Sequence, residues 1–152
     1  MPLYYARMPS PVGELTLVAS DAGLVAVLWE NDDPRRVPLR DLAVGADHPV
    51  LERTHVQLED YFAGKRTAFD LPLDFRGTDF QKSAWHALLT IPFGETRSYR
   101  QIAEALGRPT ASRAVGAANS RNPISIIAPC HRVVGTNGTP VSYTHLTLPT
   151  KA

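Results

Sequence analysis

The only cysteine of the chain, Cys130, lies in the run Pro129-Cys130-His131-Arg132 and is the residue best suited to nucleophilic chemistry. A lone free cysteine is most often a small buried core residue. Here a histidine follows it directly and arginines lie nearby in the sequence, and positive surroundings favour the thiolate, which is the reactive form. Adjacent side chains of an extended chain point in opposite directions, so we expect a bridging water to carry a proton between His131 and the sulfur. The alternative for His131 is a surface histidine without a role.

The cysteine count and the overall composition exclude several other classes of protein. A single cysteine rules out an internal disulfide and a zinc site of the multi-cysteine kind, and the five histidines (48, 55, 86, 131, 145) show no metal-ligand spacing. We therefore expect no metal site. Apolar residues make up 43% of the 152 residues, which is enough for a core, without a run long enough to cross a membrane. The N-terminus lacks the pattern of a signal peptide, so we expect a cytoplasmic protein.

Charge is distributed unevenly although the net charge is only +1. Residues 1–96 hold nine Lys/Arg and fourteen Asp/Glu, whereas residues 97–132 hold six arginines and one glutamate. A basic segment beside an acidic one is typical of a protein that binds a polyanion. The alternative is an arginine-rich surface that is merely solvated.

The N-terminal half, which we place at residues 1–76, has the pattern of a small sheet with one helix. Residues 15–19 and 24–29 are rich in strand-forming residues, and Asp21-Ala22-Gly23 between them indicates a hairpin turn. Residues 31–48 are polar and predict a loop. Apolar residues then recur at helical spacing over 51–62, with Gly64 placed to end the helix. Residues 69–75 predict an edge strand or a linker.

The second half, residues 77–138, has the pattern of three helices. Thr78 with Gln81 and Ser98 with Gln101 form two capping boxes, which mark helix starts. Pro109-Thr110 predicts the start of a third helix, and the last two helices make a candidate helix-turn-helix. The third helix is nearly all small residues over 115–118, so its backbone can approach either another helix or a nucleic-acid groove closely.

The second half resembles the O6-alkylguanine-DNA alkyltransferases, also called methylated-DNA–protein-cysteine methyltransferases. The resemblance covers residues 78–138 and rests on three segments in order, FQKSAWHALLTIPFGETRSYRQIA, SRAVGAANSRNP and NPISIIAPCHRVVG. Residues 1–75 fit the family's N-terminal half more loosely. The resemblance implies an α+β fold, with an RNase H-like sheet-and-helix half followed by a helical half that carries the helix-turn-helix.

The resemblance also implies roles for individual residues. Cys130 is the alkyl acceptor and His131 the general base through a water. Tyr99 contacts the phosphate of the target nucleotide, and Arg113 inserts into the base stack. Asn122 supports the turn before the active-site segment. The small residues of the third helix enter the minor groove, and they are Ala114, Gly116, Ala117 and Ala118.

The implied reaction is a direct, irreversible transfer of a methyl or other alkyl group from O6 of guanine, and also O4 of thymine, to the protein's own cysteine. Each molecule reacts once, needs no cofactor and acts as a monomer on double-stranded DNA. The base must leave the stack first, because its reactive carbon is inaccessible inside the duplex. A minor groove is only about 6 Å wide, which accounts for small side chains on the inserted helix.

Residues 139–152 depart from the family pattern. They contain two prolines and no Asp, Glu or Gly, whereas the family continues with a glycine turn and a closing helix whose glutamate completes a Cys–His–Glu network. Tyr143 falls at the position of the family's pocket tyrosine. We interpret residues 139–152 as an atypical tail in place of the closing helix. One hypothesis is that this tail is not part of the native sequence. Without the glutamate we expect slower transfer, or none.

Two other functions remain as hypotheses. The first is a non-catalytic protein that binds alkylated DNA, because binding residues are present while the closing helix is missing. The second is a helix-turn-helix transcription factor, which would read the major groove through long polar side chains.

Overall fold

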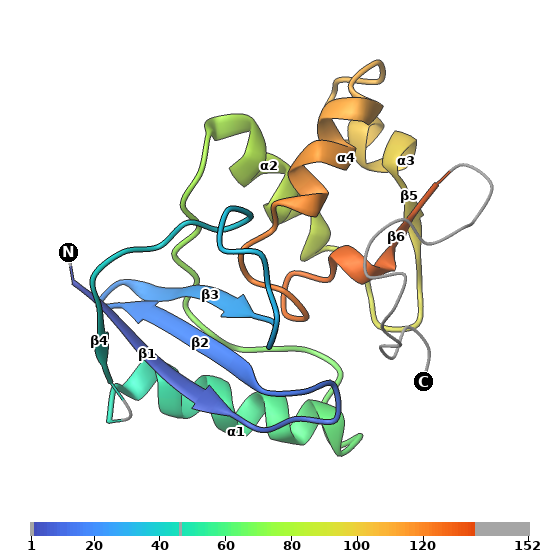
Figure 1. Ribbon diagram of the computed structural model, residues 1–152. Coiled ribbons are helices and arrows are strands. Elements are labelled where there is room, and N and C mark those ends of the chain that lie inside the picture. The colour runs from blue at the N-terminus through green and yellow to red at the C-terminus, as the bar shows by residue number, and fades with distance from the viewer. Residues whose placement is uncertain (1, 46, 136–152) are drawn as a thin grey trace. The chain divides into compact units, whose positions relative to one another are not determined.

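The chain forms two compact units, residues 1–76 and 77–152, in a computed structural model that describes residues 2–45 and 47–135 (Figure 1). No helix within those described ranges is both long and apolar enough to span a membrane.

The N-terminal unit is built on a four-stranded sheet with the order β3-β2-β1-β4. β1 and β2 pair antiparallel, as do β2 and β3, whereas β4 lies parallel to β1. The hairpin predicted around Asp21-Ala22-Gly23 is confirmed as the connection of β2 to β3. The strands are β1 (Leu3–Met8), β2 (Leu15–Ser20), β3 (Gly23–Leu28) and β4 (Leu42–Val44).

The loop predicted over residues 31–48 is wrong at β4. This strand has only three residues, and its side chains are half-buried or exposed, so the sequence shows no alternation of apolar and polar residues there. Its pairing with β1 is a long-range contact that only the fold supplies.

The free edge of β3 is covered by the chain around Leu73. The amide of Leu24 donates to the carbonyl of Pro72 (2.8 Å), and the amide of Asp74 donates to the carbonyl of Leu24 (2.7 Å). The predicted edge strand over 69–75 is therefore a single bridge between Leu24 and Leu73. Gly23 permits this approach, because a Cβ there would lie 2.8 Å from the backbone of Pro72.

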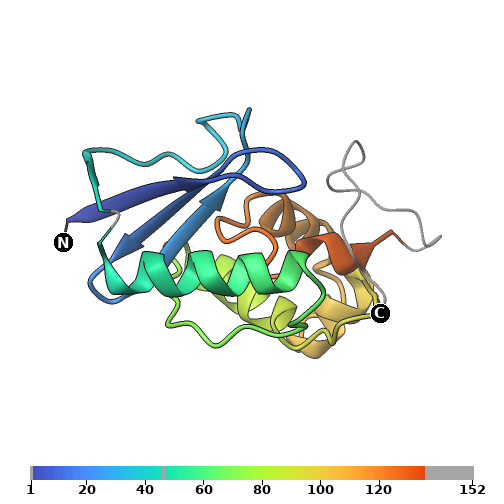
Figure 2. The same ribbon diagram turned by 90° about the horizontal axis from the view of Figure 1, so that it is seen from below.

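Helix α1 (Pro49–Phe62) lies along one face of the sheet and packs against β2 and β3 (Figure 2). It begins two residues before the predicted start, because the His48 ring accepts a hydrogen bond from the amide of Val50 and caps the helix. Gly64 has a φ of +78°, the left-handed conformation expected after a helix end. Val37 and Leu39 of the loop after β3 pack against buried residues of the sheet, among them Val18 and Ala26.

The C-terminal unit contains the three predicted helices and a short parallel pair of strands. Both predicted capping boxes are confirmed, with side-chain and backbone bonds in both directions at Thr78/Gln81 and Ser98/Gln101. α2 packs against α3 and α4, and α3 packs against α4. The elements are α2 (Asp79–Leu88), β5 (Arg97–Ser98), α3 (Tyr99–Ala105), α4 (Ser112–Ser120) and β6 (Val133–Val134).

Helix α4 begins at Ser112, three residues after the predicted start at Pro109. Residues 108–111 instead form a turn in which the amide of Ala111 donates to the carbonyl of Arg108 (2.9 Å). Gly107, with a φ of +73°, has the left-handed conformation common just after a helix end and lies beyond α3. The sequence thus located the helices correctly and misplaced the starts of α1 and α4.

The side chain of Gln57 binds the irregular segment that follows α1 in the N-terminal unit, at Asp70. Its amide donates to the carbonyl of Asp70 and accepts from the amide of Asp70, both at 2.9 Å, and the residue is 7% exposed. We expect Gln57→Leu to lower the free energy of unfolding in urea by about 1–3 kcal/mol, because the amide of Asp70 loses its partner and the carbonyl of Asp70 keeps only its bond from Arg53 (2.6 Å). Val56→Ala, next to it but 55% exposed, is the control and should change little. An equal loss in both variants would contradict this role.

Candidate active site

Cys130 begins a short 3-10 helix, η1 (Cys130–Arg132), that leads into β6. Its side chain is fully buried, with 0% exposed, and residues 122–130 before it are all buried. Burial alone fits a core cysteine as well as a nucleophile. The surroundings of Cys130 therefore decide between the two interpretations.

The buried segment that leads to Cys130 is a compact turn without regular secondary structure. The amide of Ala128 donates to the carbonyl of Ile124 (3.0 Å), and the amide of Ile127 donates to the carbonyl of Ser125 (2.8 Å). Ile126 has a φ of +72°, which is strained for a β-branched residue and costs on the order of 1–3 kcal/mol. Such strain persists only where the surrounding structure fixes the backbone, and it is concentrated at functional sites.

Asn122 fixes this turn from within. Its side-chain NH₂ donates to the carbonyl of Ala128 (2.7 Å), and its side-chain oxygen accepts from the amide of Ile124 (3.1 Å). The residue is 0% exposed, so both bonds are shielded from water. This geometry supports the turn role that the family resemblance implies for Asn122.

Three further residues hold the segment, and the sequence analysis did not single out any of them as positioning residues. Asn119 of α4 lies with its side-chain NH₂ 3.4 Å from the carbonyl of Cys130 and donates to it. Trp85 of α2 donates from its indole nitrogen to the carbonyl of Ala118 (2.8 Å). These are contacts between elements, so spacing along the chain carries no signal for them.

Arg132 is the third, and it joins η1 to the chain that follows α2. Its guanidinium donates to the carbonyl of Ile91 (2.9 Å) and lies 5.3 Å from the ring centroid of Phe93. The residue is 5% exposed, and a buried arginine is rare unless its charge is compensated. The sequence shows that Arg132 lies two residues after Cys130, but it does not show which groups the guanidinium contacts.

His131 directly follows Cys130 in η1 and is partly exposed as a whole. Both of its ring nitrogens are nonetheless shielded from solvent. A shielded imidazole is unlike the surface histidine of the alternative interpretation.

Tyr99, at the start of α3, lies against α4. A Cβ placed on Gly116 would lie 3.4 Å from the Tyr99 ring. The parallel pairing of β5 with β6 sets Ser98 opposite Val134, so the start of α3 lies beside the strand that follows Cys130. The two paired strands therefore bring Tyr99 toward the segment that carries the nucleophile.

The small residues of α4 do not all face the same way. Ala114 and Ala117 are exposed and Gly116 is half-buried, whereas Ala118 is 2% exposed. Ala118, which the resemblance places in the minor groove with the other three, packs its side chain in the core of the unit, and its contact with DNA stays a prediction. Close packing against another helix, one of the two explanations that the sequence left open, accounts for the small side chain at position 118.

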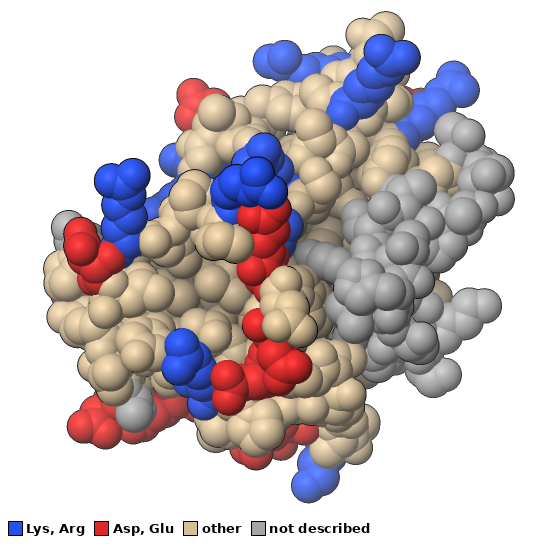
Figure 3. Space-filling view, viewed as in Figure 1, with Lys and Arg blue, Asp and Glu red and all other residues tan. Residues whose placement is uncertain are grey.

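Arg113 is exposed at the start of α4, and in the described part of the chain it makes neither an ion pair nor a hydrogen bond. Basic side chains stand out over the helices of the C-terminal unit (Figure 3). Arg100, Arg108 and Arg121 are exposed there as well. Four of the six arginines of the basic segment are thus exposed, whereas Arg132 is buried.

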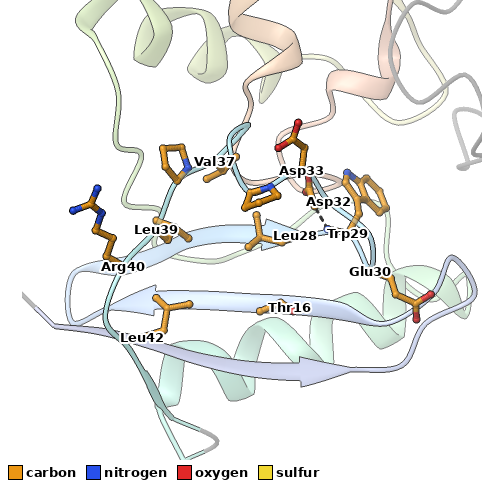
Figure 4. A pocket seen from close by; sticks show the side chains of 12 residues that line it. Thr16, Leu28, Trp29, Glu30, Asp32, Asp33, Val37, Leu39, Arg40 and Leu42 are labelled. Carbon is orange, nitrogen blue, oxygen red and sulfur yellow. Dashed lines mark hydrogen bonds between the residues drawn. The ribbon is translucent and has the colours of Figure 1, made fainter.

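A hollow lies in the N-terminal unit, between the sheet and the loop after β3 (Figure 4). Its volume is about 300 Å³, and leucines line it next to acidic side chains. Asp32 pairs with Arg36 (2.6 Å) and Asp33 with Arg35 (3.1 Å), so these carboxylates serve the loop itself. We therefore do not assign chemistry to this hollow.

Within residues 2–45 and 47–135, no group of three or more His, Cys, Asp or Glu is placed to bind a metal ion. The tail 139–152 and Tyr143, the predicted pocket residue, lie outside the described residues.

Comparison with known proteins agrees with this geometry over both units. Residues 3–75 match the model of the 6-O-methylguanine DNA methyltransferase ribonuclease-like domain, and residues 79–152 match that of the DNA binding domain of the same family. The chain belongs to the 6-O-methylguanine DNA methyltransferase family. The predicted α+β fold class, an RNase H-like half followed by a helical DNA-binding half, is confirmed.

Individual relatives are similar over nearly the whole chain. A methylated-DNA–protein-cysteine methyltransferase of Methanosarcina acetivorans is 47% identical over 93% of this chain and 89% of its own length. One of Mycobacterium tuberculosis is 46% identical over 93% of this chain and 84% of its own length. The crystal structure of Mycobacterium tuberculosis OGT in complex with DNA has a TM-score of 0.81 at 46% identity and covers 92% of this chain and 83% of that chain.

The contact of Gly116 with Tyr99 can be tested by enlarging the glycine. We expect Gly116→Ala to raise the free energy of unfolding by about 0.4–1 kcal/mol, because alanine favours the helix and its methyl group would make ordinary contact with the ring. Gly116→Leu should lower both stability and DNA affinity, because the larger group displaces Tyr99. Urea unfolding and DNA titration measure the two effects, and a Gly116→Leu variant that keeps full stability and full DNA affinity would refute the contact.

Proposed function

We propose that this chain repairs DNA by transferring an alkyl group from O6 of guanine, and also from O4 of thymine, to Sγ of Cys130. The observation that carries the proposal is the setting of Cys130. The only cysteine of the chain is fully buried in a strained turn that Asn122 braces, and it lies in a chain whose two units both match the methyltransferase family.

The reaction is a displacement at the alkyl carbon. The thiolate of Cys130 forms a bond to that carbon, the bond from the carbon to O6 breaks, and guanine leaves with the electron pair and takes up a proton. The product is a thioether, which water does not readily hydrolyse. Each protein molecule therefore reacts once, and the reaction needs no cofactor.

His131 supports the thiolate by accepting the proton of the thiol through a bridging water. Its shielded ring nitrogens favour this role, because a hydrogen bond away from bulk water is stronger than one in solvent. A free thiol requires a reducing compartment, which agrees with the cytoplasm as the place of action.

The lesion reaches Cys130 as a base rotated out of double-stranded DNA. In this proposal α4 lies in the minor groove with Ala114, Gly116 and Ala117 toward the DNA, while Arg113 fills the gap in the base stack. Exposed small residues suit a narrow groove, and an exposed arginine can stack on bases and attract phosphate. Tyr99 contacts the phosphate of the rotated nucleotide. One protein molecule acts alone on each lesion.

The same surface disfavours a transcription factor that reads the major groove. Such a protein needs long polar side chains along its recognition helix, whereas α4 exposes Ala114 and Ala117 in its middle. A non-catalytic lesion binder is disfavoured by the presence of Cys130 itself.

Direct transfer can be measured by mass spectrometry. After incubation with a duplex that contains O6-methylguanine, the peptide carrying Cys130 should gain the mass of one methylene, in a yield of at most one methyl per chain. Cys130→Ser should bind the same duplex without any mass gain. Binding by the unaltered chain without methylation of Cys130 would instead establish the non-catalytic lesion binder.

The role of Arg113 can be tested in the single-turnover rate at saturating DNA. We expect Arg113→Ala to lower this rate roughly tenfold or more. Rotating a base out of the stack costs a few kcal/mol, and without Arg113 in the gap the base returns to the stack more readily. The defect should shrink when the lesion faces a mismatched base, which leaves the stack more easily. Arg40→Ala, which removes an exposed arginine from the N-terminal unit, is the control for charge. Equal defects on matched and mismatched duplexes would contradict the role.

A further inference from the structure

The carbonyl groups on either side of Pro129 both accept hydrogen bonds from asparagine side chains, one in the last turn of α4 and one just after it. Asn122 donates to the carbonyl of Ala128 at 2.7 Å, and Asn119 donates to the carbonyl of Cys130 at 3.4 Å. The two asparagines are three residues apart, and the amide of Asn122 itself donates to the carbonyl of Asn119 (3.3 Å). Together they hold the backbone immediately before and at the nucleophile.

The turn of α4 that contains Asn119 is also fixed from the opposite side. Trp85, which is 2% exposed, donates to the carbonyl of Ala118 at 2.8 Å and so ties this turn to α2. Asn119 is likewise 2% exposed, and its bond to Cys130 is shielded from water. The packed pair of α2 and α4 therefore fixes the position of the Cys130 backbone.

We propose that Asn119 is a positioning residue for alkyl transfer, which holds the Cys130 turn at a fixed place relative to the DNA-binding helix α4. Asn119 does not touch the reacting atoms. It acts through the carbonyl of Cys130, and the sulfur then stays buried until a base enters the site. This inference rests on the proposed function for its effect on transfer, but its effect on the burial of the thiol does not depend on that function.

Because Cys130 is 0% exposed, loosening its turn has opposite effects on two reactions of the same sulfur. Transfer from a bound lesion requires a fixed geometry, and a small displacement lowers its rate by on the order of tenfold to a hundredfold. Reaction with iodoacetamide, in which the sulfur displaces iodide from a small soluble electrophile, requires only access. It therefore becomes faster when the turn opens.

The test compares Asn119→Leu and Asn119→Asp with the unaltered chain. Both replacements keep the approximate size of asparagine and lack the NH₂ donor. Ser120→Ala is the matched control, because it removes an exposed hydroxyl on the same helix whose bond goes to the carbonyl of Ala117. Each protein is measured for single-turnover methyl transfer from O6-methylguanine duplex, for duplex affinity in a Cys130→Ser background, and for iodoacetamide labelling of Cys130.

We expect both Asn119 variants to transfer methyl at least about tenfold more slowly at saturating DNA, with unchanged duplex affinity. Their labelling by iodoacetamide should accelerate by more than the rise in unfolded fraction, taken from urea curves of the same samples. Ser120→Ala should match the unaltered chain in all three measurements.

A structural role alone would give a different result. It would lower the amplitude of the single-turnover reaction and leave its rate constant unchanged, and labelling would rise only in proportion to the unfolded fraction. That result would overturn the proposal. If the unaltered chain transferred no methyl at all, the proposed function would fail, while unchanged labelling of the Asn119 variants would separately refute the positioning role.

Discussion

A buried stretch of irregular backbone must find hydrogen bonds that no helix or sheet supplies, and this constraint governs the active-site unit. Residues 122–130 are buried throughout, and an unpaired polar backbone group in such a place costs about 1–3 kcal/mol. Side-chain amides from the end of α4 supply two of the missing donors. The same bonds that satisfy the backbone therefore also decide where the cysteine lies.

The other elements of the C-terminal unit follow from that requirement. α4 can supply donors only if its own turn is fixed, and Trp85 fixes it from α2. The chain beyond the cysteine is held by Arg132 at the carbonyl of Ile91 and by the pairing of β6 with β5. Cys130 is thus braced on both sides along the chain, which is a rigid setting for a displacement that needs a fixed direction of attack.

Helix α4 serves two purposes with two different faces. Its exposed face carries Arg113, Ala114 and Ala117, which the proposed function places against DNA. Its buried face carries Ala118 and Asn119, which contact α2 and the cysteine turn. Both faces need small or compact residues, for separate reasons, so the type of residue at 118 does not show which face it lies on.

The sequence by itself determined the features that depend on neighbouring residues. The capping boxes at Thr78 and Ser98, the turn at Gly23 and the single cysteine beside a histidine are all local, and the ordered motifs of the second half sufficed to indicate the family. Tertiary structure alone decided β4, the cap at His48, the burial of Ala118 and the contacts of Asn119, Trp85 and Arg132. The indole of Trp85 reaches a carbonyl 33 residues away and the guanidinium of Arg132 one 41 residues away. Such contacts leave no periodic pattern in the chain, because they depend on which helices pack together and not on the spacing of residue types.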